Sequence, residues 1–209
     1  STVMTLTVRP YGLITSSSRV ELPDGNQMNN EYTEDTYAPK TILPLVMGLV
    51  KPKTVTDWGC NRGFWLEEVK NLGAESIHGY DMIGYDPLFR IEEKDFTQID
   101  FEHQAPMKKC DLGINVENIE HVSPVRADAL HDAICESCDV VLFSGATPGQ
   151  GGTHHVNERN HSYWHARFAR KGFMMHDLIR WCVNDDPKVY PWYKDNTFLY
   201  SRVPLPIIR

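Results

Sequence analysis

The chain has 209 residues and a formal net charge of −7 at pH 7, with 41% hydrophobic and 23% charged residues. This length and balance are typical of one globular domain, and no apolar run approaches the roughly 20 residues that span a bilayer. The acidic balance disfavours a general nucleic-acid-binding protein, which needs a basic surface.

The chain begins with a polar stretch, and its apolar elements follow later. We expect a single domain over residues 1–209, in which residues 1–37 form an N-terminal extension or cap and residues 38–209 form the core. Apolar residues recur at helical spacing over residues 38–50, and Pro52 separates this predicted helix from the next element.

Residues 54–81 combine two short β-type runs with a helix between them. The first run leads into Asp57, Gly59 and Gly63, an amphipathic helix follows, and the second run ends at Asp81. Glycines allow a sharp turn and a close approach to a ligand, and the N-terminus of the helix attracts an anionic group. An acid at the tip of the second strand can accept hydrogen bonds from ribose hydroxyls. This order indicates a nucleotide-binding α/β sheet.

The glycine spacing does not fit a dinucleotide cofactor. A G-x-G-x-x-G fingerprint that starts at Gly59 would need glycines where the chain has Asn61 and Phe64. Asparagine tolerates left-handed backbone geometry better than most residues, so we expect the turn to keep its shape. An NAD-dependent oxidoreductase is therefore a weaker reading of this stretch.

Further strands and helices alternate along the rest of the chain, which predicts a mostly parallel sheet. Ser123 and Pro124 predict the start of a helix, as a cap followed by proline. The run from 139 to 144 is apolar and β-branched, as in a strand that is buried on both faces. The other predicted strands lie at 89–96, 110–115, 173–176 and 196–202, and the other predicted helices at 162–171 and 177–183.

Two polar clusters follow predicted strands. His121 lies beside Glu120 after the fourth strand, and a histidine titrates near neutrality, so it suits the role of a general base. A glycine-rich loop after the fifth strand carries His154, His155, Asn157 and Glu158. We expect the polar side chains of this loop to contact the substrate, and we expect Glu158 to orient one of the histidines. It is equally open that His121 only forms hydrogen bonds that support the site and does not touch the substrate.

The sequence gives little sign of a metal site or a redox pair. His161 and His165 lie four residues apart, but no acid accompanies them at ligand spacing, so we expect no metal. Cys135 and Cys138 form a single C-x-x-C inside a helical stretch without a second pair. Five cysteines, an odd number, indicate free thiols in a reducing compartment, and we expect a cytoplasmic protein.

Taken together, several motifs resemble class I S-adenosyl-L-methionine (SAM)-dependent methyltransferases over residues 40–202. They are D-W-G-C-x-x-G-x-W-L, N-V-E-x-x-E-H, P-G-Q-G-G-x-x-H-V-N-E and D-D-P-x-V-x-x-W-Y-x-x-N-T-x-L. The chain departs from the usual first motif at Asn61, where a glycine is common. The similarity is to a group often found beside sugar-modifying functions and in phages or large viruses.

The resemblance implies an α/β fold of the Rossmann-like class I type. Such a fold has a mostly parallel seven-stranded sheet with an antiparallel last strand and helices on both faces. It also implies SAM as the cofactor, with an acid and its neighbour after the third strand on the adenine. The implied cofactor contacts are Asp57, Gly59, Cys60, Gly63, Asp81, Asp95, Phe96, Asn115 and Glu117.

The expected function is O-methylation of a sugar or another small polar acceptor. His121 or His154 would be the base, and His155, Asn157 and Glu158 would contact the acceptor. The alternative is a nucleic-acid methyltransferase that acts on a viral cap, RNA or DNA. A non-catalytic SAM-binding module and an NAD-dependent oxidoreductase are weaker alternatives.

Overall fold

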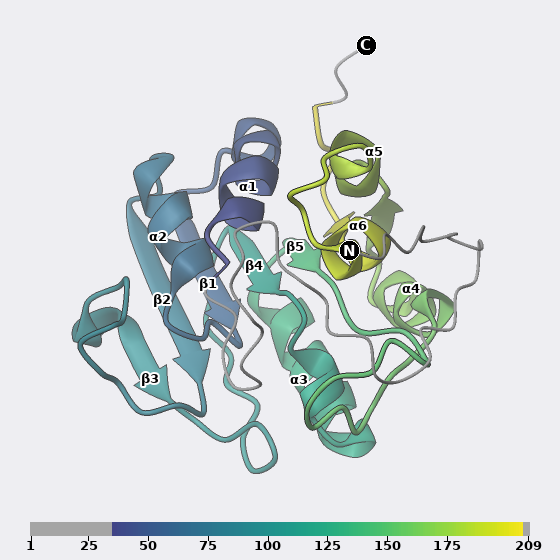
Figure 1. The fold of residues 1–209 in the computed structure, drawn as a ribbon, viewed down its shortest axis with the longest axis horizontal. Coiled ribbons are helices and arrows are strands. Elements are labelled where there is room, and N and C mark those ends of the chain that lie inside the picture. Colours follow the sequence, from purple (N-terminus) through teal and green to yellow (C-terminus); the bar gives the residue numbers. More distant parts are fainter. Residues whose placement is uncertain (1–34, 207–209) are drawn as a thin grey trace, which may run out of the picture.

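A seven-stranded sheet forms the centre of residues 35–206, the part of the chain that the computed structural model describes (Figure 1). The strand order is β3-β2-β1-β4-β5-β7-β6, and β7 runs antiparallel to both β5 and β6. The strands are β1 (Thr54–Trp58), β2 (Ser76–Asp81), β3 (Phe96–Gln98), β4 (Leu112–Asn115), β5 (Val140–Phe143), β6 (Met174–His176) and β7 (Phe198–Ser201).

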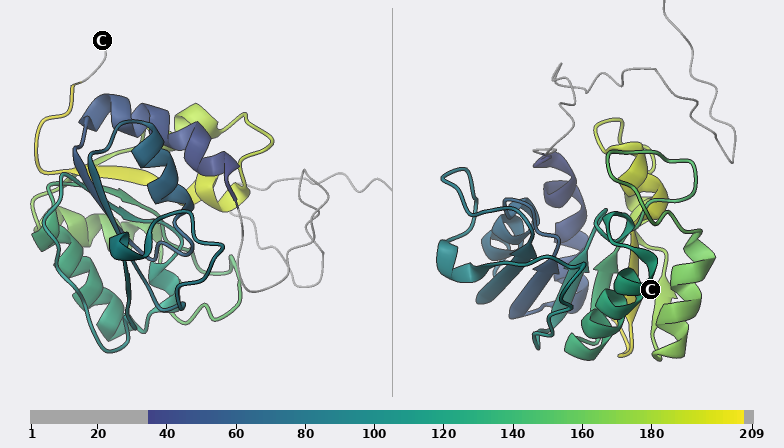
Figure 2. Two further views of the ribbon diagram at one scale, coloured as in Figure 1. Left: turned by 90° about the vertical axis from the view of Figure 1, so that its left-hand side faces the viewer. Right: turned by 90° about the horizontal axis from the view of Figure 1, so that it is seen from below.

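Helices cover both faces of this sheet, as Figure 2 shows. The strand β5 illustrates the arrangement, because Leu142 packs in the cluster with α1 and α2 while Val141 packs with α3 and α4. The helices are α1 (Tyr37–Val50), α2 (Phe64–Asn71), α3 (Pro124–Ser137), α4 (His161–Arg170), α5 (Ile179–Val183) and α6 (Pro191–Asn196), with short 3-10 turns η1 (Glu93–Asp95) and η2 (Ile119–His121). The predicted sheet with helices on both faces and an antiparallel last strand is confirmed.

The parallel strands end together, and this edge positions the candidate site. In register, Trp58 lies beside Tyr80 and Asn115 lies beside Phe143. The loops that follow β1, β2, β4 and β5 therefore emerge at one edge of the sheet, where open α/β sheets bind their ligands.

The third strand was predicted over residues 89–96, and this prediction is wrong. Strand β3 begins at Phe96, where its first partner on β2 is Gly79. The three residues before it form η1, and the residues before η1 form a loop. Phe89 packs within this loop region, with its ring centroid 4.5 Å from that of Tyr85 and 4.8 Å from that of Phe96. An apolar run can pack in a loop as well as in a strand, so sequence pattern did not separate the two.

The N-terminal extension predicted over residues 1–37 lies outside the described residues except for residues 35–37. Tyr37 begins α1, and its hydroxyl donates to Asp186 Oδ2 at 2.8 Å. The helix α6 was not expected from the sequence. No helix among residues 35–206 has both the length and the apolar character needed to cross a bilayer.

The turn between β1 and α2 depends on Gly59. Its φ is +95°, and a Cβ atom there would lie 2.2 Å from Asn118 Cγ, in the loop after β4. Gly73, which follows α2, has a φ of +107° but open space around it. Both glycines therefore have a left-handed backbone, and only at Gly59 would a Cβ atom also clash with a neighbouring side chain.

We expect Gly59→Ala to lower the free energy of unfolding by about 1–3 kcal/mol more than Gly73→Ala, because only the first change also forces the Asn118 side chain to move. Urea unfolding followed by circular dichroism measures both. Equal losses in the two variants would show that the contact between the loops after β1 and β4 contributes nothing.

Candidate active site

Backbone N–H groups tie the turn after β1 to the end of β2. Gly59 and Cys60 donate to the Tyr80 carbonyl oxygen at 2.8 and 3.1 Å, and Asn61 N donates to Asp81 Oδ2 at 2.7 Å. Asn61 has a φ of 47°, and its Oδ1 accepts from Arg62 N at 2.7 Å. The expectation that asparagine can take the left-handed position of a glycine is confirmed.

Asp81 holds this turn and still faces the loops of the edge. Its Oδ1 accepts from Ile83 N at 3.2 Å, so both carboxylate oxygens bond to backbone and keep further lone pairs. Burial raises the pKa of Asp81, although backbone N–H groups oppose the shift. Met82, the next residue, is 66% exposed and offers an apolar surface beside the acid.

Asp57 is a buried carboxylate at the floor of a cavity. It is 1% exposed, and its Oδ1 has no hydrogen-bond partner among residues 35–206. Burial, followed by the charge of Asp81, raises the pKa of Asp57 well above its usual range. An acceptor buried without a donor is costly, so this oxygen suits a ligand that brings a donor or a positive charge.

The cavity of about 110 Å³ lies between the turn after β1, the end of β4 and α6. The sequence predicted ligand contacts for Asp57, Gly59, Cys60 and Glu117, and the cavity brings these four together. Trp192 and Tyr193 of α6 also line it and were missed by the sequence analysis. The only sequence signal for them was the aromatic stretch near the C-terminus.

Gly63 does not line this cavity but caps α2, with a φ of +87°. A Cβ atom there would lie 2.9 Å from Ile91 Cγ2. A larger hollow of about 300 Å³, lined by residues such as Cys110 and Asp139, contains none of the loops that follow β1, β2, β4 and β5.

The predicted adenine contacts, Asp95 and Phe96, lie at the wrong end of β3. Phe96 pairs with Gly79, and Gln98 pairs with Asp81, so Asp95 precedes the strand. The same Asp-Phe dipeptide recurs as Asp100-Phe101 just after the carboxyl end of β3. Asp95 therefore lies away from the edge of the sheet where the loops after β1, β2, β4 and β5 emerge.

Asn115 and Glu117 follow β4 in different environments. Asn115 is fully buried, and its Nδ2 donates to the Trp58 carbonyl oxygen at 2.6 Å, so its amide group joins β4 to β1. Glu117 has a φ of 47°, and its carboxylate accepts from Gln150 Nε2 at 2.8 Å and Asn196 Nδ2 at 3.2 Å. Burial raises the pKa of Glu117. Of the two, only Glu117 lines the cavity.

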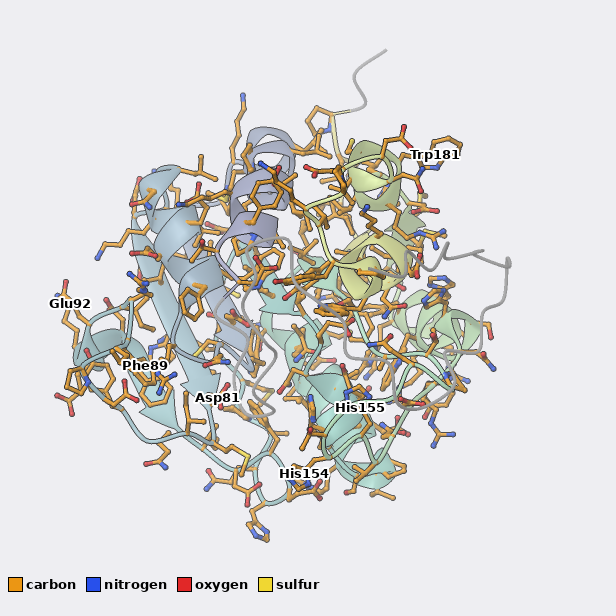
Figure 3. The ribbon with its side chains drawn as sticks, viewed as in Figure 1. Asp81, Phe89, Glu92, His154, His155 and Trp181 are labelled. Atoms are coloured by element: carbon orange, nitrogen blue, oxygen red, sulfur yellow. The ribbon has the colours of Figure 1, made fainter. Side chains whose placement is uncertain are left out.

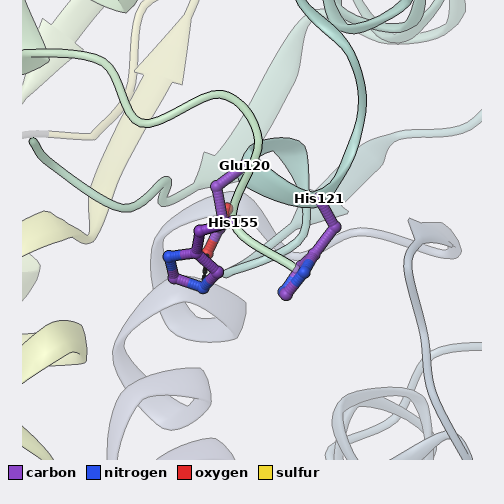
Figure 4. A group of neighbouring side chains, drawn as sticks. All are labelled: Glu120, His121 and His155. Atoms are coloured by element: carbon purple, nitrogen blue, oxygen red, sulfur yellow. Dashed lines mark ion pairs between the residues drawn. The ribbon is translucent and has the colours of Figure 1, made fainter. Parts of the chain in front are cut away.

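A second cluster adjoins this cavity and consists of Glu120, His121 and His155 (Figure 4). Glu120 is 1% exposed, and its two carboxylate oxygens have no hydrogen-bond partner among residues 35–206. His155 Nε2 lies 4.0 Å from Glu120 Oε1, and the rings of His121 and His155 have centroids 4.9 Å apart. The loop after β5 is held there because Val156 N and Asn157 N donate to the Glu120 carbonyl oxygen at 2.9 and 3.0 Å.

Electrostatics in this cluster are dominated by burial. Burial raises the pKa of Glu120 well above its usual range, and the neighbouring Glu117 raises it further. The pKa of His121 is lowered by burial and then by His155, which favours its neutral form. A neutral imidazole can accept a proton or bind a cation.

The remaining residues predicted in the loop after β5 have separate positions. His154 is exposed and has a φ of 60°. Figure 3 labels it together with His155 of the same loop and Asp81 at the end of β2. Asn157 is buried, and its Oδ1 accepts from Arg159 Nε at 2.8 Å. Glu158 accepts from Gly149 N and Gly151 N at 2.8 Å each, and from His155 Nδ1 at 3.0 Å. The expectation that Glu158 orients a histidine is confirmed.

His161, His165 and the cysteines were considered as metal-binding or redox residues from the sequence. His161 and His165 contact Asn196 Oδ1 at 3.0 Å and the Tyr200 hydroxyl at 2.5 Å, so both rings face the antiparallel part of the sheet. Glu120 approaches a different histidine, His155, from another loop, so an acid and a histidine that are distant in the sequence lie close together. All five cysteines are free, as expected.

Comparisons with known proteins give a structural likeness and no sequence match. No protein-family model matches this chain, and no curated protein does. Human N-acetylserotonin methyltransferase in complex with SAM is similar at a TM-score of 0.51 and 16% identity, over 80% of this chain and 52% of that one. This chain thus spans about half the length of the human protein.

Two other solved structures match over most of both chains. The DhpI–SAH complex has a TM-score of 0.55 and 16% identity, over 79% of this chain and 83% of that one. Magnesium protoporphyrin IX methyltransferase from Synechocystis PCC 6803, with bound SAM, has a TM-score of 0.55 and 14% identity, over 83% and 87%. Identities this low establish the fold alone. The described part of the chain has the Rossmann-like fold of SAM-dependent methyltransferases.

Proposed function

We propose that this protein is a SAM-dependent methyltransferase that methylates a hydroxyl group of a sugar or another small polar molecule. The observation that carries the proposal is the pair of acids around the turn after β1. Asp81 ends β2 with lone pairs to spare, and Asp57 has a buried oxygen without a donor. The two acids match the ribose hydroxyls and the ammonium group of SAM. The preference for a sugar rests on the sequence resemblance to a group found beside sugar-modifying functions.

The residues of the cavity and of the neighbouring end of β2 have distinct roles in holding the cofactor. Asp81 accepts hydrogen bonds from the ribose, and Asp57 stabilises the positive charge of the methionine end. Gly59 lets the backbone approach the ligand closely, while Met82 offers an apolar surface to the adenine. SAM, when bound, supplies a methyl group on a sulfonium centre. Five free thiols support a cytoplasmic setting.

The acceptor site lies on the side of Glu120, His121 and the loop after β5. The ring of His121 is accessible, and partial desolvation by the surrounding loops lowers its pKa and favours the neutral form, so it is available to take a proton from a hydroxyl group. His154 is an alternative base in the same region. His155 contacts the acceptor, whereas Asn157 and Glu158 hold the loop through bonds within it. Catalysis then consists of aligning the acceptor and removing its proton.

We expect Asp81→Ala to weaken SAM binding by about 30- to 1000-fold, because charge-assisted hydrogen bonds to the ribose are lost. Isothermal titration calorimetry measures the affinity, and NAD serves as the comparison ligand, for which we expect no binding. Glu75→Ala is the matched control, since this exposed acid precedes the same strand at its other end. Binding of NAD without binding of SAM would overturn the proposal.

We expect the double variant His154→Ala/His155→Ala to keep SAM affinity within about threefold and to lose turnover by about a hundredfold or more. Turnover is the release of S-adenosylhomocysteine in the presence of a panel of monosaccharides and nucleosides. Parallel loss of SAM affinity would move the loop to the cofactor side. Unchanged turnover on a methylated acceptor would make the loop a surface feature.

A further inference from the structure

We propose that Glu120, His121 and His155 bind a divalent first-row transition-metal cation. The ligand atoms of these three residues all lie within 4.8 Å of one another. The cation site itself does not depend on the function proposed above, whereas its role in binding the acceptor does. Three separate observations support the site: a buried carboxyl group with little compensation, the orientation of one histidine, and the spacing of the ligand atoms.

The Glu120 carboxyl group is buried with little compensation from the described residues. Its side chain is 1% exposed, and neither oxygen has a hydrogen-bond partner among residues 35–206. No lysine or arginine in that part of the chain forms an ion pair with Glu120 or with Glu117 beside it. Burial of this kind favours the protonated carboxyl group when the site is empty. A bound metal ion would favour the carboxylate instead.

The orientation of His155 presents a lone pair to Glu120. Its Nδ1 lies 3.0 Å from Glu158 Oε1, and a carboxylate only accepts, so Nδ1 carries the proton of the neutral ring. Nε2 is then an acceptor and faces Glu120 Oε1 at 4.0 Å, too far for a hydrogen bond. Two acceptors that face each other across this gap leave a place for a cation between them. Metal-binding histidines commonly donate their other nitrogen to a carboxylate, as His155 does.

The position of the His155 ring is itself enforced by close packing. A Cβ atom at Gly152 would lie 2.4 Å from His155 Nε2, so any larger residue there would displace the ring. Gly152 therefore has a physical reason to be a glycine that is independent of turn formation. The loop after β5 holds His155 from two sides, through Gly152 and Glu158.

The spacing and type of the ligand atoms select the class of cation. Ligand atoms that lie about 2.1 Å from one ion are at most about 4.2 Å apart. The ligand atoms of the three residues lie within 4.8 Å, so a small shift of the exposed His121 side chain would bring them to bonding distance of one ion. Two imidazoles and one carboxylate suit zinc, manganese and similar ions better than magnesium or calcium, which prefer oxygen ligands. Three protein ligands leave coordination positions open for other molecules.

The site lies next to the cofactor cavity, because Glu117 lines that cavity and precedes Glu120 by only three residues. If the proposed function holds, an open metal position would bind a hydroxyl oxygen of the acceptor and make its proton more acidic, and His154, rather than the metal-bound His121, would take that proton. A sugar offers neighbouring hydroxyl groups that can occupy two such positions. The metal would therefore position the acceptor against the cofactor.

The test is calorimetric titration of the full chain, freed of metal by a chelator and dialysis, with manganese and zinc chloride in the absence of SAM. We expect one cation per chain, at least about a hundredfold weaker binding for Glu120→Gln, and about 10- to 100-fold weaker binding for Glu158→Gln. The double variant His161→Gln/His165→Gln is the matched control and should bind as the wild type does.

Urea unfolding of the metal-free protein separates loss of the site from loss of the fold. Glu120→Gln removes a buried acid, so its free energy of unfolding should equal or exceed that of the wild type. Failure of both cations to bind with one-to-one stoichiometry, or equal binding by Glu120→Gln, would overturn the proposal. Because SAM is absent, the outcome is independent of whether the chain binds that cofactor.

Discussion

Three backbone N–H groups hold the turn after β1 against the end of β2, and the candidate site depends on this attachment. Gly59 and Cys60 donate to the Tyr80 carbonyl oxygen, and Asn61 donates to Asp81. The bonds fix the direction of α2, the position of the Asp81 carboxylate and one wall of the cavity that contains Asp57. Gly59 makes the attachment possible, because the space for a Cβ atom is filled by Asn118.

Local features of the fold could be predicted from the sequence because their causes are local. Glycine positions, apolar spacing and a strand-terminal acid define the unit from 54 to 81 within one stretch of chain. The left-handed backbone of Asn61 follows from side-chain chemistry alone. The predicted bounds of the third strand were wrong because Phe89 and neighbouring apolar residues pack on one another in a loop. That error placed the expected adenine contacts, Asp95 and Phe96, at the amino end of β3.

The acceptor side of the site was less accessible to sequence reasoning, because distant segments form it. Glu120 and His155 belong to different loops and meet only because the backbone after His155 bonds to the Glu120 carbonyl oxygen. Spacing rules look for ligands within one helix or loop, so they drew attention to His161 and His165, which bond elsewhere. Glu120 and Asp57 are buried acids with carboxylate oxygens that lack a hydrogen-bond partner among residues 35–206, and no local sequence pattern encodes this property.

The central claim is that the turn after β1 and the acid at the end of β2 hold SAM. A crystal structure of the full chain with S-adenosylhomocysteine tests it most directly. The account predicts that the ribose hydroxyls lie within hydrogen-bond distance of Asp81 and that the ammonium group approaches Asp57. Density for the ligand at another edge of the sheet, or against neither acid, would contradict it.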